Sequence, residues 1–167
     1  MIREFKKEHK WLSNFAPCEI HFNGMLFASV EHAYMSAKSN DMEWKKFCAD
    51  SNNSAGTVKK KSKEIELRED WQSVKVEVMG QLLEVKFSQE PYRGLLLETG
   101  DSFIQEGNWW GDTFWGVDLK TNTGENTLGL LIMAIREELE EEESRKNLPQ
   151  IMVKRVISFF RRLLRLG

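Results

Sequence analysis

SVEHAYMSAK, residues 29–38, is the stretch around which we expect the rest of the chain to fold. Ser29 follows an aromatic-rich turn and is a favourable N-cap residue, so a helix is predicted to begin after it. Glu31, Tyr34 and Lys38 occupy positions i, i+3 and i+7, which places them on one stripe of that helix. One helix face therefore presents a carboxylate, a phenol and an amine, groups from which acid, base and nucleophile roles are drawn.

The same residues also allow a purely structural interpretation. A carboxylate in the first turn, here Glu31, complements the positive end of the helix dipole, and Lys38 can extend into solvent. Because short motifs often arise by chance, the stretch taken alone favours this structural interpretation. A catalytic interpretation needs support from the remainder of the chain.

The composition is that of one globular domain. The chain has 167 residues, of which 41% are hydrophobic and 30% are charged, enough to bury a substantial core. A net charge of -2 argues against a broadly basic surface that coats nucleic acid. Cys18 and Cys48 cannot form a disulfide framework, and no Cys/His spacing indicates a zinc site. The sequence has no apolar run typical of a signal peptide or a membrane span, so we expect a cytoplasmic protein.

Hydrophobic periodicity and turn residues predict an α+β fold, a mainly helical single domain with a small N-terminal hairpin sheet. Strands are predicted over residues 3–8 and 18–27, and Asn23-Gly24 marks a hairpin turn. The basic run of residues 59–63 is predicted to be a solvated helix face or a phosphate contact. Further helices are predicted over residues 42–49, 71–88, 91–98 and 126–139, and irregular binding loops over residues 101–118.

The charge pattern changes abruptly towards the C-terminal end. Residues 137–143 are glutamates apart from one leucine, whereas residues 144–167 contain basic residues and no acid. On a helical wheel, residues 151–166 have one apolar side and one cationic side. We therefore divide the chain into a domain over residues 1–143 and a basic amphipathic helix over residues 144–167. We expect this helix to dock on protein, on its own domain or on a partner, in preference to a membrane interface.

Three blocks of motifs follow one another along the chain. The first is LSNF at residues 12–15, NG at 23–24 and the stretch 29–38; the second is LREDW at 67–71, VK at 74–75, VM at 78–79 and KF at 86–87; the third is LLLETG at 95–100, DTFWG at 112–116 and NTLG at 126–129. In this order and spacing the blocks resemble the NADAR superfamily, which includes riboflavin-biosynthesis-intermediate N-glycosidases. The resemblance covers residues 5–139 and departs from the family pattern at Met35, at Glu69 and in the loop 117–125.

The resemblance implies hydrolysis of an N-ribosyl bond and points to the residues that perform it. The family's functional carboxylates and tryptophans are matched by Glu31, Asp112, Trp71 and Trp115, and its accompanying polar positions are matched by Asn14, Lys38 and Asn126. With Tyr34 from the opening helix, these residues form the candidate site. Each also has a structural alternative: Trp71 as a core residue, Asp112 as a turn former and Asn126 as a helix cap.

The chemistry of the bond agrees with this set. Cleavage between ribose C1′ and a base nitrogen passes through an oxocarbenium-like cation, as in glycoside hydrolysis. Such a site needs a carboxylate near C1′, a way to deliver water and a cleft for the base. Glu31 and Asp112 supply the carboxylates, while Trp71 and Trp115 offer flat faces on which a base can stack.

Two mechanisms stay open at C1′. In the first, Glu31 or Asp112 activates water; in the second, the Lys38 amine attacks the sugar and forms a Schiff base after ring opening. The second requires a desolvated lysine with a depressed pKa. We favour direct water attack because paired carboxylates suffice for it, and we expect neither a metal nor another cofactor.

We therefore predict an N-glycosidase. Some members of the family that the chain resembles remove ADP-ribose from guanine, so the resemblance implies ADP-ribose on guanine, in a nucleotide or in nucleic acid, as the preferred substrate. A phosphoribosyl pyrimidine intermediate of riboflavin biosynthesis follows as the second choice. Two functions of other classes remain as alternatives. One is a non-catalytic module that binds ADP-ribose or NAD, and the other is a membrane-attached interaction protein that acts through residues 151–166.

Overall fold

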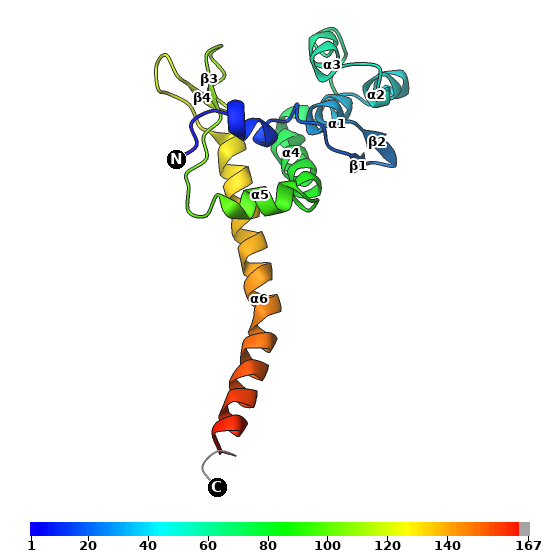
Figure 1. Ribbon diagram of the computed structural model, residues 1–167. Coiled ribbons are helices and arrows are strands. Elements are labelled where there is room, and N and C mark those ends of the chain that lie inside the picture. Colours follow the sequence, from blue (N-terminus) through cyan, green and yellow to red (C-terminus); the bar gives the residue numbers. More distant parts are fainter. Residues whose placement is uncertain (164–167) are drawn as a thin grey trace.

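Helices arranged around a central helix, α4, form the body of the protein. A computed structural model describes residues 1–163, with side chains described through residue 146 (Figure 1). The elements in chain order are the 3-10 helix η1 (Lys7–Leu12), β1 (Ile20–Phe22), β2 (Met25–Phe27), α1 (Val30–Ala37), α2 (Met42–Ala49), α3 (Ala55–Lys61), α4 (Trp71–Phe87), α5 (Tyr92–Glu98), β3 (Gly107–Asn108), β4 (Val117–Asp118) and α6 (Thr127–Leu163). The predicted α+β class, mainly helical with a small hairpin sheet, is confirmed.

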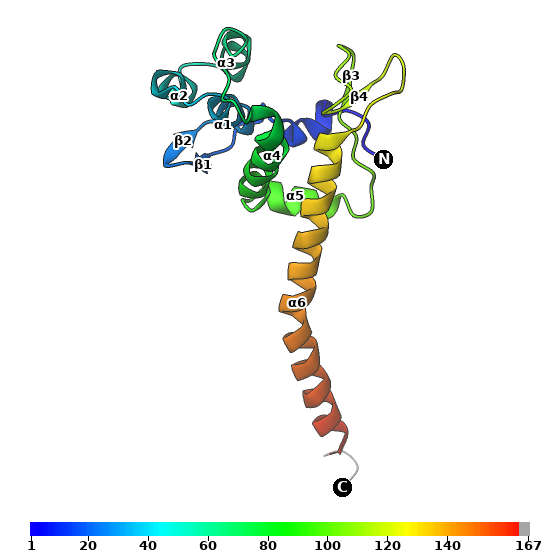
Figure 2. The same cartoon turned by 180° about the vertical axis from the view of Figure 1, so that it is seen from behind.

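Two groups of elements lie on either side of this body. One group consists of α1, α2, α3 and the β1–β2 hairpin, and the other consists of the β3–β4 pair and the start of α6 (Figures 1 and 2). Between them lie η1 and α4, while α5 packs against α4 and α6. A long internal helix is predicted over residues 71–88, and α4 fills that range with a core of Val78, Met79, Leu82, Leu83 and Phe87.

The hairpin forms where its turn residues predict it. Asn23 and Gly24 both have positive φ, 49° and 75°, as a type I′ turn requires and as Asn-Gly favours. The turn sets an antiparallel register in which Ile20 pairs with Phe27, and both side chains are buried. The hairpin is shorter than the predicted range of residues 18–27, but it occupies the predicted place beside α1.

The stretch of residues 29–38 forms α1, as predicted. The Ser29 hydroxyl accepts a hydrogen bond from the His32 N–H, which caps the helix. Every residue from Val30 to Ala37 is buried, because α1 contacts α2, α3, α4 and the hairpin. Burial extends to Glu31, so this carboxylate of the first turn is not an ordinary solvated charge.

The predicted strand over residues 3–8 is wrong. Ile2 forms an isolated parallel bridge with Ile104, and the chain then enters η1. Lys7 has a φ of 51°, a left-handed conformation that ends the extended segment. The N-terminal residues nevertheless support the second group of elements, since the Gly107 N–H donates to the Arg3 carbonyl over 3.1 Å.

α6 runs without a break from Thr127 to Leu163 and extends away from the body (Figures 1 and 2). The basic helix predicted over residues 144–167 is therefore part of α6 as far as Leu163, and its docking on protein stays a prediction. Glu142 and Glu143 pair with Arg93 of α5 at 3.6 and 2.8 Å, so the acidic run is held against the body. The amphipathic face predicted for residues 151–166 lies outside the described side chains. No described helix is both long enough and apolar enough to cross a membrane.

Candidate active site

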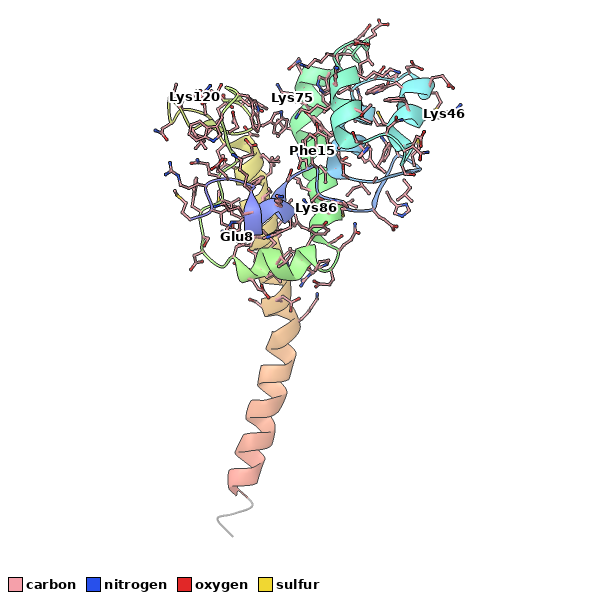
Figure 3. All side chains as sticks on the ribbon, turned by 45° about the horizontal axis from the view of Figure 1, so that its top comes forward. Glu8, Phe15, Lys46, Lys75, Lys86 and Lys120 are labelled. Carbon is pink, nitrogen blue, oxygen red and sulfur yellow. The ribbon has the colours of Figure 1, made fainter. Side chains whose placement is uncertain are left out.

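A cleft of about 400 Å³ opens between the two groups of elements. Its lining comes from α1, α3, the first half of α4, the loop after η1 and the segment from Glu106 to Trp115. Phe15 and Lys75, which Figure 3 labels, are part of this lining. Seven of the eight residues predicted from the sequence also line the cleft: Asn14, Glu31, Tyr34, Lys38, Trp71, Asp112 and Trp115.

Glu31 is a buried carboxylate in the cleft. Its side chain is 4% exposed, and its Oε1 atom lies 3.4 Å from the Lys59 ammonium without hydrogen-bond geometry. Burial raises the pKa of Glu31 above its ordinary value, while the charge of Lys59 opposes this shift. The Asn14 Oδ1 atom is also buried without a hydrogen-bond partner. Buried acceptors are rarely left unpaired in a purely structural role, so these two atoms point to recognition of a ligand or water.

Asp112 is held in a defined orientation by its own loop. One carboxylate oxygen, Oδ1, accepts hydrogen bonds from the backbone N–H groups of Phe114 and Trp115 over 3.2 and 2.9 Å. These donors shape the turn, and they also stabilise the negative charge of the carboxylate. The structural and functional interpretations of Asp112 are therefore compatible.

The aromatic residues of the site pack around Tyr34. Its ring lies 5.0 Å from that of Trp71 and 5.7 Å from that of Trp115, between ring centroids. Trp71 and Tyr34 are buried, so Trp71 acts largely as a core residue, whereas Trp115 is partly exposed to the cleft. Burial raises the pKa of Tyr34, so its phenol stays neutral at ordinary pH.

Lys38 ends α1 inside the cleft rather than in solvent. Partial burial lowers the pKa of its ammonium group, and nearby Lys59 lowers it further, while Glu31 opposes the change. The desolvation that a Schiff-base mechanism requires is therefore present to some degree. This feature was not visible in the sequence.

Asn126 does not line the cleft. Its Oδ1 atom accepts from the Glu106 N–H over 2.9 Å, and its Nδ2 atom donates to the Ile104 carbonyl over 2.9 Å. Both ends of the amide thus hold the segment that leads to Glu106, and neither caps α6. A direct contact with substrate is not available to Asn126 in this arrangement.

Comparison with protein families decides where the chain belongs. The model of the NADAR domain matches residues 2–140. The chain belongs to the NADAR family. Two N-glycosidases match it over most of their length. YbiA of Escherichia coli is 33% identical over 78% of this chain and 82% of that protein. An N-glycosidase of Nostoc punctiforme is 35% identical over 76% of this chain and 83% of that protein.

Two further comparisons bear on the NADAR assignment. The solved structure of E. coli YbiA has a TM-score of 0.74 and 29% identity, and covers 85% of this chain and 84% of that one. This similarity agrees with the α+β fold described above. A riboflavin biosynthesis protein of Vibrio vulnificus is 36% identical over 81% of this chain. The chain spans 37% of the length of that longer protein.

Two lining residues of this NADAR cleft and one buried residue beside it were not predicted as site residues. Glu106 lines it, and Lys59 of α3 reaches Glu31. Asn108 is fully buried beneath the Asp112 loop. Lys59 belongs to the basic run of residues 59–63, for which a phosphate contact was one interpretation, and residues 59–61 of that run form the last turn of α3. Glu106 and Asn108 lie in the segment predicted as binding loops, where no periodicity distinguished them.

No group of three or more His, Cys, Asp or Glu within the described residues is placed to bind a metal.

Replacement of Trp115 by alanine is expected to weaken substrate binding by about 1–3 kcal/mol, the worth of one stacking face. Trp115 is the partly exposed tryptophan of the Tyr34 cluster, so its loss removes a face without emptying the core. The measurement is a titration calorimetry comparison with wild type, using a non-hydrolysed analogue. Trp109→Phe, at an exposed tryptophan outside the cleft lining, is the control. Unchanged affinity in a folded Trp115→Ala protein would exclude stacking.

Proposed function

We propose that this protein hydrolyses the bond between ribose C1′ and a base nitrogen, and that its substrate is ADP-ribose carried on guanine. The observation that carries the proposal is the meeting of Glu31 and Asp112, from separate elements, in one cleft beside Trp115. Negative charge, a proton acceptor and a stacking surface are the parts that cleavage of an N-ribosyl bond requires.

The reaction class rests on the family. Relatives that match this chain over most of their own length are named N-glycosidases, so the predicted hydrolase of N-glycosyl bonds is confirmed at family level. The substrate is a finer proposal and rests on the cleft. A riboflavin biosynthesis protein among the relatives supports a riboflavin-pathway intermediate as the second choice.

Each carboxylate has its own part in the proposed reaction. As the C1′–N bond breaks, positive charge develops on the sugar, and the oriented carboxylate of Asp112 stabilises it. Water attacks C1′ and transfers a proton to Glu31, whose Oε1 atom receives no hydrogen bond from the protein. Because the pKa of Glu31 is raised, it is a stronger proton acceptor than an ordinary carboxylate. The products are a sugar hydroxyl and a free base.

The rest of the lining favours a substrate with phosphates and more than one ring system. Four lysines line the cleft, and an ammonium group is a suitable partner for phosphate. Trp110 and Phe15 also line it and are 68% and 42% exposed, which adds aromatic faces to that of Trp115. ADP-ribosyl guanine contains a diphosphate and two purines, so it engages more of these groups than a phosphoribosyl pyrimidine does.

The test is incubation with ADP-ribosylated guanosine and, separately, with a phosphoribosyl pyrimidine intermediate, followed by mass spectrometry. Free guanosine and ADP-ribose from the first substrate support the proposal. Turnover of the pyrimidine alone supports the riboflavin-pathway substrate. Binding of ADP-ribose by calorimetry, with no turnover of either compound, would make the protein a binding module.

Lys38 provides a second prediction about mechanism. If water attacks C1′ directly, sodium borohydride added during turnover traps no protein–ribose adduct, and Lys38→Ala keeps part of its activity. Intact-mass spectrometry of the wild type and of Lys38→Ala is the measurement. An adduct on the wild type that Lys38→Ala lacks would establish the Schiff-base mechanism, which the lowered pKa of Lys38 makes chemically accessible.

Catalysis is expected to be independent of the distal part of α6. A chain that ends at Lys146 retains the pairs of Glu142 and Glu143 with Arg93 and every residue of the cleft. Its kcat/KM on a soluble substrate should therefore equal that of the full chain.

Sedimentation of the full chain with anionic vesicles, lost in the shorter one, would establish membrane contact through residues 151–166. The cytoplasmic location stays a prediction.

A further inference from the structure

Glu106 is a third carboxylate in the cleft, and its backbone is fixed on both sides. Its N–H donates to the Asn126 Oδ1 atom over 2.9 Å, and its carbonyl accepts from the Val117 N–H over 2.9 Å. The side chain is partly buried and lines the same cleft as Glu31 and Asp112. A residue held in this way presents its carboxyl group at a defined place in the site.

The space for this carboxyl group depends on a glycine. A Cβ atom at Gly116 would lie 1.8 Å from Glu106 Oε2 and 2.1 Å from the Glu106 carbonyl oxygen. Both distances are far below contact, so only glycine at position 116 leaves room for the Glu106 side chain as it stands. The DTFWG motif thus ends in the residue that accommodates this carboxyl group.

One buried amide connects Glu106 with Asp112. The Nδ2 atom of Asn108 lies 3.4 Å from Glu106 Oε2 and donates to the Asp112 carbonyl over 2.7 Å. The Oδ1 atom of Asn108 accepts from the Asp112 N–H over 3.0 Å. Asn108 is completely buried, so it links the two acidic residues through a rigid support.

Burial and the neighbouring charges bring the pKa of Glu106 close to neutral pH. Burial raises the pKa of Glu106 to about 7, the charges of Asp112 and Glu4 raise it, and Asn108 and Lys59 lower it. The other ionisable groups that line the same cleft are Glu31, Tyr34, Lys6, Lys38 and Lys75. Asp112, in contrast, receives two backbone hydrogen bonds that stabilise its charge. A carboxyl group that holds a proton beside a hydrogen-bonded carboxylate is the arrangement in which one group donates the proton and the other stabilises developing positive charge.

We propose that Glu106 is the general acid of this site and gives its proton to the base nitrogen that leaves C1′. The inference rests on the proposed N-glycosidase function. As the C1′–N bond breaks, its electron pair goes to the nitrogen, which takes the Glu106 proton. Water forms the new C1′–O bond and releases its proton to Glu31. The cycle closes when Glu31 gives up a proton and Glu106 regains one from solvent.

The test compares Glu106→Gln with wild type on two substrates that both contain ADP-ribose and differ in the group attached to C1′. The first carries guanine, which needs a proton to leave. The second is the 4-nitrophenyl glycoside, whose phenolate leaves without one. On the guanine substrate, Glu106→Gln should lower kcat about 10²-fold and abolish the fall of wild-type kcat above about pH 7. On the 4-nitrophenyl substrate, its kcat should be close to that of wild type.

Two comparisons separate this role from a structural one. Glu4→Gln removes the neighbouring carboxylate outside the cleft lining, so it should move the pH decline on the guanine substrate slightly downwards and leave kcat below that decline unchanged on both substrates. Glu106→Asp should retain the decline at high pH, because it keeps a carboxyl group. Equal losses of Glu106→Gln on both substrates, or an unchanged pH profile, would overturn the general-acid role. Wild type that cleaves neither substrate would overturn the proposed function itself, and with it the role of Glu106.

Discussion

Replacing Glu31 by glutamine lowers turnover about 10²-fold or more while the protein stays folded. The amide has the size of the carboxylate but cannot accept a proton from water. The fold should tolerate it, because Oε1 of Glu31 makes no hydrogen bond and the Lys59 partner is half-exposed. Turnover by mass spectrometry, with circular dichroism to verify folding, is the measurement. Glu43→Gln, an exposed first-turn carboxylate of α2, is the matched control and should have the wild-type rate.

Asp112→Asn should produce a loss of the same order by a different route. The asparagine retains an oxygen that accepts from the Phe114 and Trp115 N–H groups, so the turn is preserved while the charge beside C1′ is lost. A near-normal rate in either folded variant would remove that residue from the mechanism. A loss in Asp112→Asn together with an altered fold would mean that Asp112 acts through the turn alone.

The parts of the fold that local rules determine were predictable from the sequence. Asn23-Gly24 defined the hairpin, because few other residue pairs adopt the two positive φ values of its turn. Ser29 defined the start of α1 through its cap. The strand at residues 3–8 failed for the opposite reason. Phe5 is the only apolar residue among residues 3–8, so no hydrophobic alternation favoured a strand there, and the left-handed backbone of Lys7 has no sequence signal.

In the candidate site too, local sequence patterns predicted some residues and not others. Glu31, Tyr34 and Lys38 share a stripe of one helix, so helical spacing alone brought them together. Asp112 and Trp115 lie on a loop, and only the family resemblance connected them with α1. Glu106 has neither signal, because its place depends on the Asn108 amide and on Gly116. α6 continues as one helix past residue 143, where the charge of the side chains changes.

Lys86 is a fully buried lysine, and its ionisation should make stability depend on pH. Its Nζ atom donates to the Ser13 carbonyl over 2.8 Å and faces the rings of Phe87 and Tyr92. Burial lowers the pKa of Lys86 from 10.5 to about 7, although the charge of Cys18 opposes the change. The folded protein therefore loses this proton near neutral pH, while the unfolded chain keeps it until about pH 10.

The sign of the pH dependence follows from the two proton affinities. Between about pH 7 and pH 10 the unfolded chain binds more protons at Lys86 than the folded protein, so the free energy of unfolding rises with pH. Below that window the full penalty of burying the charge remains. We expect this group to contribute about 2 kcal/mol of added stability between pH 7 and pH 9. Urea titrations at the two pH values measure it.

Lys86→Met should remove that dependence and, at the same time, impair the site. Methionine fills a similar volume without charge, so at about pH 7 the variant should be more stable than wild type, and its advantage should shrink at pH 9. The lost donor leaves the Ser13 carbonyl unpaired, which costs about 1–3 kcal/mol and limits the gain. Ser13 precedes Asn14 and Phe15 in the cleft lining, so kcat/KM should fall although stability rises. Lys60→Met, on the exposed side of α3, should change neither property. If the pH dependence of stability seen in wild type persisted in Lys86→Met, it would show that Lys86 stays charged when buried.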